Sequence, residues 1–142
     1  MADFPTSIAL DVATPLGMAL SLQTDSVQVP SALGEVGVLP GHLPLLAALR
    51  PGIMAYRQNG QLVRAAVGAG YVEVTADSVR LIAEFFMLRE QIDVELAQKD
   101  LHASEGRLKA CKGTVDDIEY LEAEREVQWA QARLTLAASA AN

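Results

Sequence analysis

The sequence lacks several features that define common protein classes. Its 142 residues include one cysteine, Cys111, so no internal disulfide can form. No stretch approaches the roughly 18 consecutive apolar residues of a membrane-spanning helix. The first residues also lack the basic start and apolar run of a signal peptide. We therefore expect a protein of a cytosolic, reducing compartment, with no direct membrane insertion.

Positive charge is scarce as well. Eleven Lys and Arg stand against 18 Asp and Glu, which gives a formal net charge of −7. Nucleic acids and anionic membrane surfaces are bound by clustered Lys and Arg, so we expect neither as a direct partner. Aromatic residues make up only 5%, but hydrophobic residues reach 51%, which is enough for a folded core. Other proteins are the expected partners.

The chain to about residue 87 has the alternating pattern of strands. Ile8, Leu10 and Val12 recur at every second position, and after a Pro15–Gly17 break we expect Met18, Leu20 and Leu22 to repeat the pattern. Further on, "IMAYRQNGQLVRAAV" places two strand-like runs around Asn59–Gly60, a pair that suits a type I′ hairpin. Short strands with frequent turns predict an N-terminal antiparallel β-sandwich, or flattened barrel, over residues 1–87.

One glycine-rich stretch in this part, "VGAGYVEV", is not a phosphate-binding loop. It lacks the G-x-x-x-x-G-K-[ST] pattern whose backbone cradles phosphates. We interpret its glycines as sites of a bulge or of a close approach between strands.

After Arg89 the pattern changes to that of helices. Two apolar stripes with steps of three and four residues are separated by a break at Lys112–Gly113, and Thr114 with Asp117 is predicted to form a capping box for the second helix. The stripes predict a C-terminal antiparallel two-helix hairpin over residues 88–142. The larger side chains expected to pack within it are Val94, Leu101, Leu108, Tyr120, Val127 and Leu134.

Residues suited to catalysis or metal binding are poorly placed. His102 and Cys111 lie on or beside the first helical stripe, where packing is the simplest interpretation. One cysteine and two distant histidines cannot supply the four close ligands of a zinc site. The acidic run of residues 116–126 is interpreted as a solvated helix face. We predict no catalytic residue, no metal and no cofactor.

The stretch "GEVGVLPGHLPLLAALRPG", residues 34–52, is the motif not yet assigned a role. Its glycines and prolines predict a rigid turn system, which would hold Glu35 and His42 at defined positions. On composition alone, a plain tight turn is the simpler interpretation.

The same stretch carries a family resemblance. "VQVPSALGEVGVLPGHLPLLAALRPG" resembles the V-x-V-P strand and G-E-x-G-[VI]-x-P-G-H-x-P-L-[LV] motif of the ATP synthase epsilon subunit. "GAGYVEVTADSVRLIAE", "QIDVELAQKDL" and "VDDIEYLEAEREVQWAQARL" resemble later parts of that family, in the family's order. The resemblance covers nearly the whole chain, and it implies the same sandwich and helix pair.

The resemblance implies a non-catalytic rotor subunit of an F-type ATP synthase. In the family, the sandwich packs on the gamma subunit and its turn system contacts the c-ring of the membrane sector. The extended hairpin reaches the alpha/beta catalytic head and hinders ATP hydrolysis. Carried over by motif, the expected ring-contact residues are Glu35, Gly37, Pro40, Gly41 and His42. The expected location is peripheral, at the cytoplasmic face of a bacterial cell membrane; a missing transit segment favours a bacterial or plastid-encoded protein.

The nucleotide motif of some family members is degenerate in this chain. The pattern [IL]-D-x-x-R-A is met by Ile92, Asp93 and Ala97, but Leu96 stands where the arginine belongs. On the second helix, Arg133 is the basic residue that remains, because Trp129 occupies the other expected position. A triphosphate would lose a cationic partner, so we expect weak or absent ATP binding.

Two other function classes compete with this interpretation. A free-standing β-sandwich binding module could dimerise through its helix pair, and it would be a stable homodimer on its own. A hydrolase that uses His42 is the weaker alternative, since no positioned nucleophile accompanies that histidine.

Overall fold

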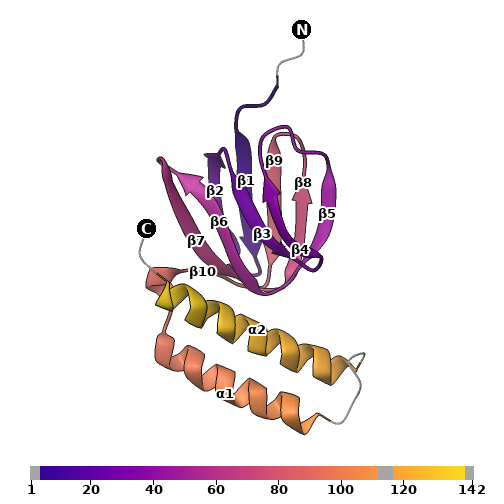
Figure 1. Cartoon of the computed structure of the whole chain (residues 1–142), viewed down its shortest axis with the longest axis vertical. Coiled ribbons are helices and arrows are strands. Elements are labelled where there is room, and N and C mark those ends of the chain that lie inside the picture. Colours follow the sequence, from indigo (N-terminus) through magenta and orange to yellow (C-terminus); the bar gives the residue numbers. More distant parts are fainter. Residues whose placement is uncertain (1–3, 112–116, 140–142) are drawn as a thin grey trace.

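The computed structural model describes residues 4–111 and 117–139. The strands form a flattened barrel, and two helices lie side by side across one end of it (Figure 1). The predicted fold class, a β-sandwich followed by a helical hairpin, is confirmed. The strands are β1 (Ile8–Thr14), β2 (Gly17–Thr24), β3 (Val27–Ser31), β4 (Gly34–Val38), β5 (Leu45–Leu49), β6 (Gly52–Gln58), β7 (Gln61–Val67), β8 (Gly70–Val74), β9 (Ser78–Ala83) and β10 (Phe86–Leu88).

The strands join in the order β10-β7-β6-β3-β5-β8-β9-β1-β2, and β4 pairs with β3. One pair departs from the predicted antiparallel arrangement, because β1 and β9 run parallel. Alternate residues point into the barrel, where they are screened from water on every side. The buried core consists of Ile8, Leu10, Val12, Val27, Val29, Val38, Leu49, Met54, Tyr56, Ala65, Val67, Val72, Val74, Val79, Leu81 and Ala83.

The predicted inward position of Met18 is wrong. The register of β1 with β2 shifts at Val12 and Ala13, so that Ala19 is one extra residue in β2. A bulge of this kind reverses the side-chain alternation beyond it. Leu20 and Leu22 therefore pack against the core, whereas Met18 faces outward and is 62% exposed.

The predicted turn and the predicted close approach are both present. Asn59 and Gly60 have φ angles of 52° and 78°, the positive values that a type I′ hairpin requires at both central residues. At Gly70 an added Cβ would lie 1.8 Å from the carbonyl oxygen of Ile82. Strands β8 and β9 can pair there only because residue 70 has no side chain.

The hairpin consists of α1 (Val94–Ala110) and α2 (Ile118–Ala138), which pack on each other. Their N-caps are Asp93 and Asp117, whose side chains accept hydrogen bonds from the backbone of Leu96 and Glu119. The second helix therefore begins later than the capping box predicted. Lys112, Gly113 and Thr114, where the break and that cap were expected, lie outside the described residues.

Small residues line the contact between the helices. Ala97 and Ser104 of α1 and Ala123, Val127 and Ala130 of α2 are buried. The predicted packing residues Leu101, Leu108, Tyr120 and Leu134 are half-buried. Val94 departs from the prediction: it is the first residue of α1 and is 43% exposed.

A second face of α2 docks on the barrel. Ala132 and Leu136 pack on Ala66 of β7, and Ile53, Ile92 and Trp129 surround them. A 3-10 turn, η1 (Arg89–Gln91), connects the two parts. The guanidinium of Arg89 donates to the carbonyl oxygen of Leu136 at 3.1 Å and to Ser139 Oγ. The predicted boundary at residue 87 falls one residue before the end of β10.

Candidate functional site

The segment of residues 34–52 begins with an edge strand. Among the described strands, β4 pairs only with β3, so one of its edges is free (Figure 1). Gly34 opens the strand with φ of +122°, and its carbonyl oxygen accepts a hydrogen bond from Ser31 Oγ at 2.6 Å. Leu33, at the tip of the β3–β4 turn, is 94% exposed. The turn presents an apolar tip to solvent.

A second turn follows at the other end of β4. Pro40 and Gly41 are its central residues, Gly41 has φ of +86°, and the backbone N–H of His42 donates to the carbonyl oxygen of Leu39 at 3.2 Å. These are the features of a type II turn. The N–H of Gly41 also donates to the carbonyl oxygen of Ala76 at 2.7 Å, which ties this turn to the β8–β9 connection.

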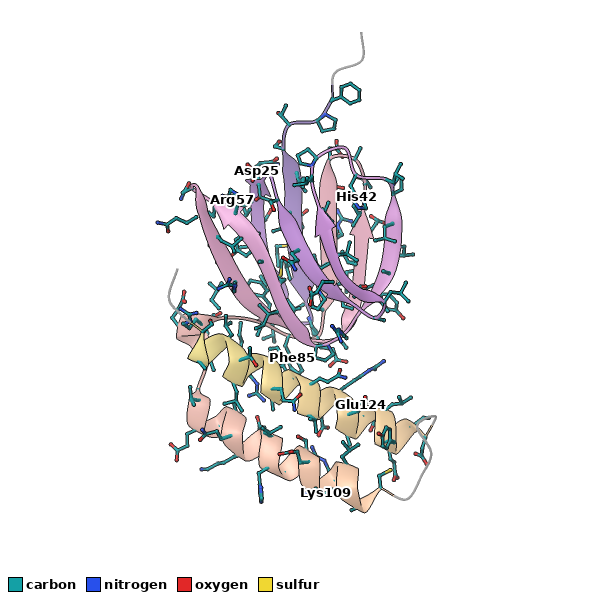
Figure 2. The ribbon with its side chains drawn as sticks, in the orientation of Figure 1. Asp25, His42, Arg57, Phe85, Lys109 and Glu124 are labelled. Atoms are coloured by element: carbon teal, nitrogen blue, oxygen red, sulfur yellow. The ribbon has the colours of Figure 1, made fainter. Side chains whose placement is uncertain are left out.

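Glu35 and His42 are held at opposite ends of β4. Glu35 lies beside the β3–β4 turn, where its carboxylate is 3.9 Å from the guanidinium of Arg50, and both side chains are about half exposed. His42 is half-buried at the end of the barrel far from the helices, and its Nδ1 is 2.6 Å from the carbonyl oxygen of Leu43 (Figure 2). Gly37 lies between them, with open space where a side chain would be. The five predicted contact residues thus form a line, with Glu35 and Gly37 on β4 and Pro40, Gly41 and His42 in the turn that follows it.

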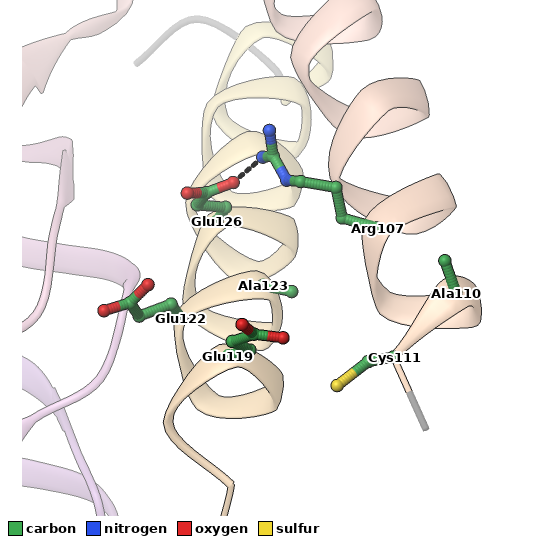
Figure 3. Close-up of a pocket in the computed structure, with 7 residues that line it drawn as sticks. All are labelled: Arg107, Ala110, Cys111, Glu119, Glu122, Ala123 and Glu126. Atoms are coloured by element: carbon green, nitrogen blue, oxygen red, sulfur yellow. Dashed lines mark ion pairs between the residues drawn. The ribbon is translucent and has the colours of Figure 1, made fainter. Parts of the chain in front are cut away.

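The possible catalytic and metal-binding groups remain separate from this line. Cys111 ends α1 beside a pocket of 370 Å³ between the helices, where Arg107 pairs with Glu126 and Glu122 points away from the sulfur (Figure 3). Ligand atoms of Cys111, Asp117 and Glu119 lie within 4.8 Å of one another. However, Asp117 already caps α2, and the positive end of a helix dipole opposes a cation. This group is a poor metal site.

A surface that the sequence pattern did not reveal lies on the outer face of the barrel. Five residues are cross-strand neighbours there, and we call them the apolar row; they are Ala48, Tyr71, Ile82, Ala13 and Met18. Tyr71, Ile82 and Met18 are each about 60% exposed. A groove of 470 Å³ runs along four of the five, and Arg125 of α2 forms part of its wall. Contiguous exposed apolar side chains make this row a candidate protein contact. One signal for this surface was present in the sequence. Strands β8 and β9 carry apolar residues at outward-facing as well as inward-facing positions.

The residues of the degenerate nucleotide motif have structural roles. Asp93 caps α1, Ala97 is fully buried, and Ile92 packs against the cluster of Ala66, Ala132 and Leu136. Arg133 is buried, and its Nη2 donates to Asp100 Oδ2 at 3.0 Å. Its guanidinium is already paired within the hairpin, and weak or absent ATP binding stays a prediction.

Comparison with known proteins decides the family. The profile of "ATP synthase, Delta/Epsilon chain, beta-sandwich domain" matches residues 7–89. The ATP synthase epsilon chain of Geobacter sulfurreducens is 36% identical over 134 residues, 94% of this chain and 96% of the relative. That of Nitratidesulfovibrio vulgaris (strain DP4) is 37% identical over 134 residues, 94% and 98% of the two chains. The chain belongs to the ATP synthase epsilon family.

Solved structures agree on the fold. A chain in the Euglena gracilis mitochondrial ATP synthase, in a structure of OSCP, F1 and the c-ring, aligns with a TM-score of 0.75 at 20% identity, covering 92% of this chain and 81% of that one. The prediction of a non-catalytic subunit of an ATP synthase, and not an enzyme on its own, is confirmed by the epsilon relatives. No helix within residues 4–111 and 117–139 is long and apolar enough to cross a membrane.

Proposed function

We propose that this chain is a central-stalk subunit that couples rotation of the c-ring to ATP synthesis, and that it docks on the gamma subunit through the apolar row. The observation that carries the proposal is the exposure of Tyr71, Ile82 and Met18 along one row of cross-strand neighbours. A preformed face loses little conformational entropy when it binds. Such a face suits a subunit that must transmit torque.

Gamma binding tests the docking surface directly. Replacing Tyr71 and Ile82 together with serine should weaken binding to the cognate gamma subunit at least tenfold by calorimetry, because large apolar side chains dominate such interfaces. Leu62→Ser, a change at an exposed leucine of β7, is the matched control and should bind normally. If the double variant binds the gamma subunit normally, the apolar row is not the gamma-binding face.

The ring contact is proposed along the free edge of β4, from Glu35 to the Pro40–His42 turn. Because the line runs along β4 and into the turn after it, its two ends can be tested one at a time. Glu35→Gln and His42→Gln should each lower ATP-driven ion pumping in the assembled complex, with hydrolysis retained. Asp25→Asn, beside Arg57 on the barrel, serves as the charge-matched control. If both variants pump normally, the edge of β4 is not the ring contact.

The extended hairpin is proposed to meet the alpha/beta head only weakly. The described part of α2, with its cap, carries Asp117, Glu119, Glu122, Glu124 and Glu126 against two arginines, and one of these, Arg133, is buried in an ion pair. We expect the full chain and residues 1–91 to bind the stripped catalytic head with similar effects on its ATP hydrolysis rate. Strong inhibition by the full chain alone would show that the hairpin inhibits despite its acidity.

The complex is proposed to sit at the cytoplasmic face of a bacterial membrane.

The free-standing dimer is the less favoured function. The apolar stripes of α1 and α2 face each other within one chain, so that they are not available for a partner copy. Analytical ultracentrifugation of the isolated chain should therefore give a monomer. A stable dimer would favour the binding-module alternative.

A further inference from the structure

One pair of stacked aromatic rings lies in the contact between the barrel and the hairpin. Phe85, in the connection between β9 and β10, stacks on Trp129 of α2 with ring centroids 4.9 Å apart and planes 16° from parallel. Figure 2 shows Phe85 at the end of the barrel that faces α2. Phe85 is 46% exposed, so the barrel core does not need its ring. Its position serves the contact with the hairpin.

Phe85 is positioned on the barrel by its contacts with Gly68. The N–H of Gly68 donates to the carbonyl oxygen of Phe85 at 2.9 Å, and a Cβ on Gly68 would lie 2.9 Å from Phe85 Cδ2. The ring therefore lies directly on the backbone of residue 68. Any side chain there would displace the ring from Trp129.

On the hairpin side, Trp129 is connected to α1 through a buried cation. The guanidinium carbon of Arg133 lies 5.2 Å from the centre of the Trp129 ring, within the range of a cation–π interaction. The side chain of Arg133 is only 7% exposed, and Asp100 of α1 accepts its hydrogen bond at 3.0 Å. A buried guanidinium needs such a partner, because an unpaired charge away from water is costly.

We propose that Phe85, Trp129, Arg133 and Asp100 form one latch, through which the pairing of α1 with α2 controls the docking of the hairpin on the barrel. Without the carboxylate of Asp100, the guanidinium turns towards water and leaves the indole ring. The ring then loses the cation that fixes its orientation, so the stack with Phe85 weakens although neither aromatic residue has changed. The latch lies within one chain and does not depend on the proposed partners.

NMR relaxation of the backbone ¹⁵N nuclei, measured on the full chain, tests the latch. A docked hairpin tumbles with the barrel, whereas a released hairpin shows a shorter correlation time than the barrel. We expect one shared correlation time in the wild type, and a shorter hairpin time in Phe85→Ala and in Asp100→Asn. Helical circular dichroism should be retained in both. Phe85→Leu is the milder variant if Phe85→Ala folds poorly.

The double variant distinguishes one latch from two separate contacts. If the four residues act together, Phe85→Ala with Asp100→Asn should release the hairpin by less than the sum of the two single effects. Glu105→Gln, an exposed acid of α1, and Phe4→Ala, an exposed aromatic residue, should both behave as the wild type. Additive effects, a normal Asp100→Asn variant, or a wild-type hairpin that tumbles separately would each overturn the proposal.

Discussion

The barrel and the hairpin are stabilised in different ways. The barrel core draws fully buried Val, Leu and Ile side chains from most of its strands, so each strand is fixed by several others. The contact between the hairpin and the barrel has three buried residues, Ala66, Ala132 and Leu136, and its surrounding side chains are partly exposed. Burial of apolar area is the main stabilising term. The barrel is therefore the rigid part of the molecule, and the pose of the hairpin depends on a few specific side chains.

The largest effect is expected where two strands of the barrel approach most closely. Gly70→Ala would place a Cβ 1.8 Å from the carbonyl oxygen of Ile82, so β8 and β9 must separate. We expect a loss of about 4 kcal/mol or more in the free energy of unfolding, measured by urea denaturation. Gly37→Ala is the matched control, with open space at its Cβ, and it should change stability by less than about 1 kcal/mol. Similar midpoints for the two variants would contradict the assigned strand contact.

A smaller effect is expected when the contact between the helices is overfilled. Ala130 is completely buried between α1 and α2, so Ala130→Leu should force the helices apart at a cost of about 1–3 kcal/mol. Because the barrel has its own core, the helical signal should be lost at lower urea than the barrel signal. Ala103→Leu, at an exposed position of α1, is the control and should unfold as the wild type does. A single unchanged transition for Ala130→Leu would mean that the helices are not closely packed there.

The sequence pattern was sufficient where a single periodicity determines burial. Alternation at Ile8, Leu10 and Val12 predicted a strand, because one side of each barrel strand is dry. Steps of three and four residues predicted the helices for the same reason. The pattern failed at Met18, where the bulge at Ala19 depends on pairing with β1 and leaves no mark in hydrophobicity.

Contacts between distant parts of the chain were also missed. The second face of α2 carries Ala132 and Leu136, and its burial depends on where the hairpin docks. The apolar row joins residues of five strands that are adjacent only in the folded sheet. Tertiary pairing, which a single sequence does not encode locally, decides both.

High pH should act at the boundary between the two regions. Tyr56 of β6 is 2% exposed; burial and the nearby carboxylate of Glu90 raise its pKa above the ordinary 10.0. Its contribution to stability is complete below pH 10 and is lost as the pH rises through the raised pKa of the folded state. Stability should therefore fall above pH 10 in the wild type and stay flatter in Tyr56→Phe. Parallel curves for the two proteins, measured by urea denaturation at several pH values, would exclude Tyr56 as the cause.

The smallest effect is expected at the exposed ion pair of the hairpin. Arg107 and Glu126 bridge α1 and α2, but their side chains are 60% and 51% exposed, so water and salt screen their attraction. Glu126→Gln should lower the free energy of unfolding by less than about 1 kcal/mol, and 1 M NaCl should abolish the difference. A larger, salt-resistant loss would mean that charge holds the helices together. The expected small loss would leave the buried alanines and the Asp100–Arg133 pair as the contacts that keep α1 on α2.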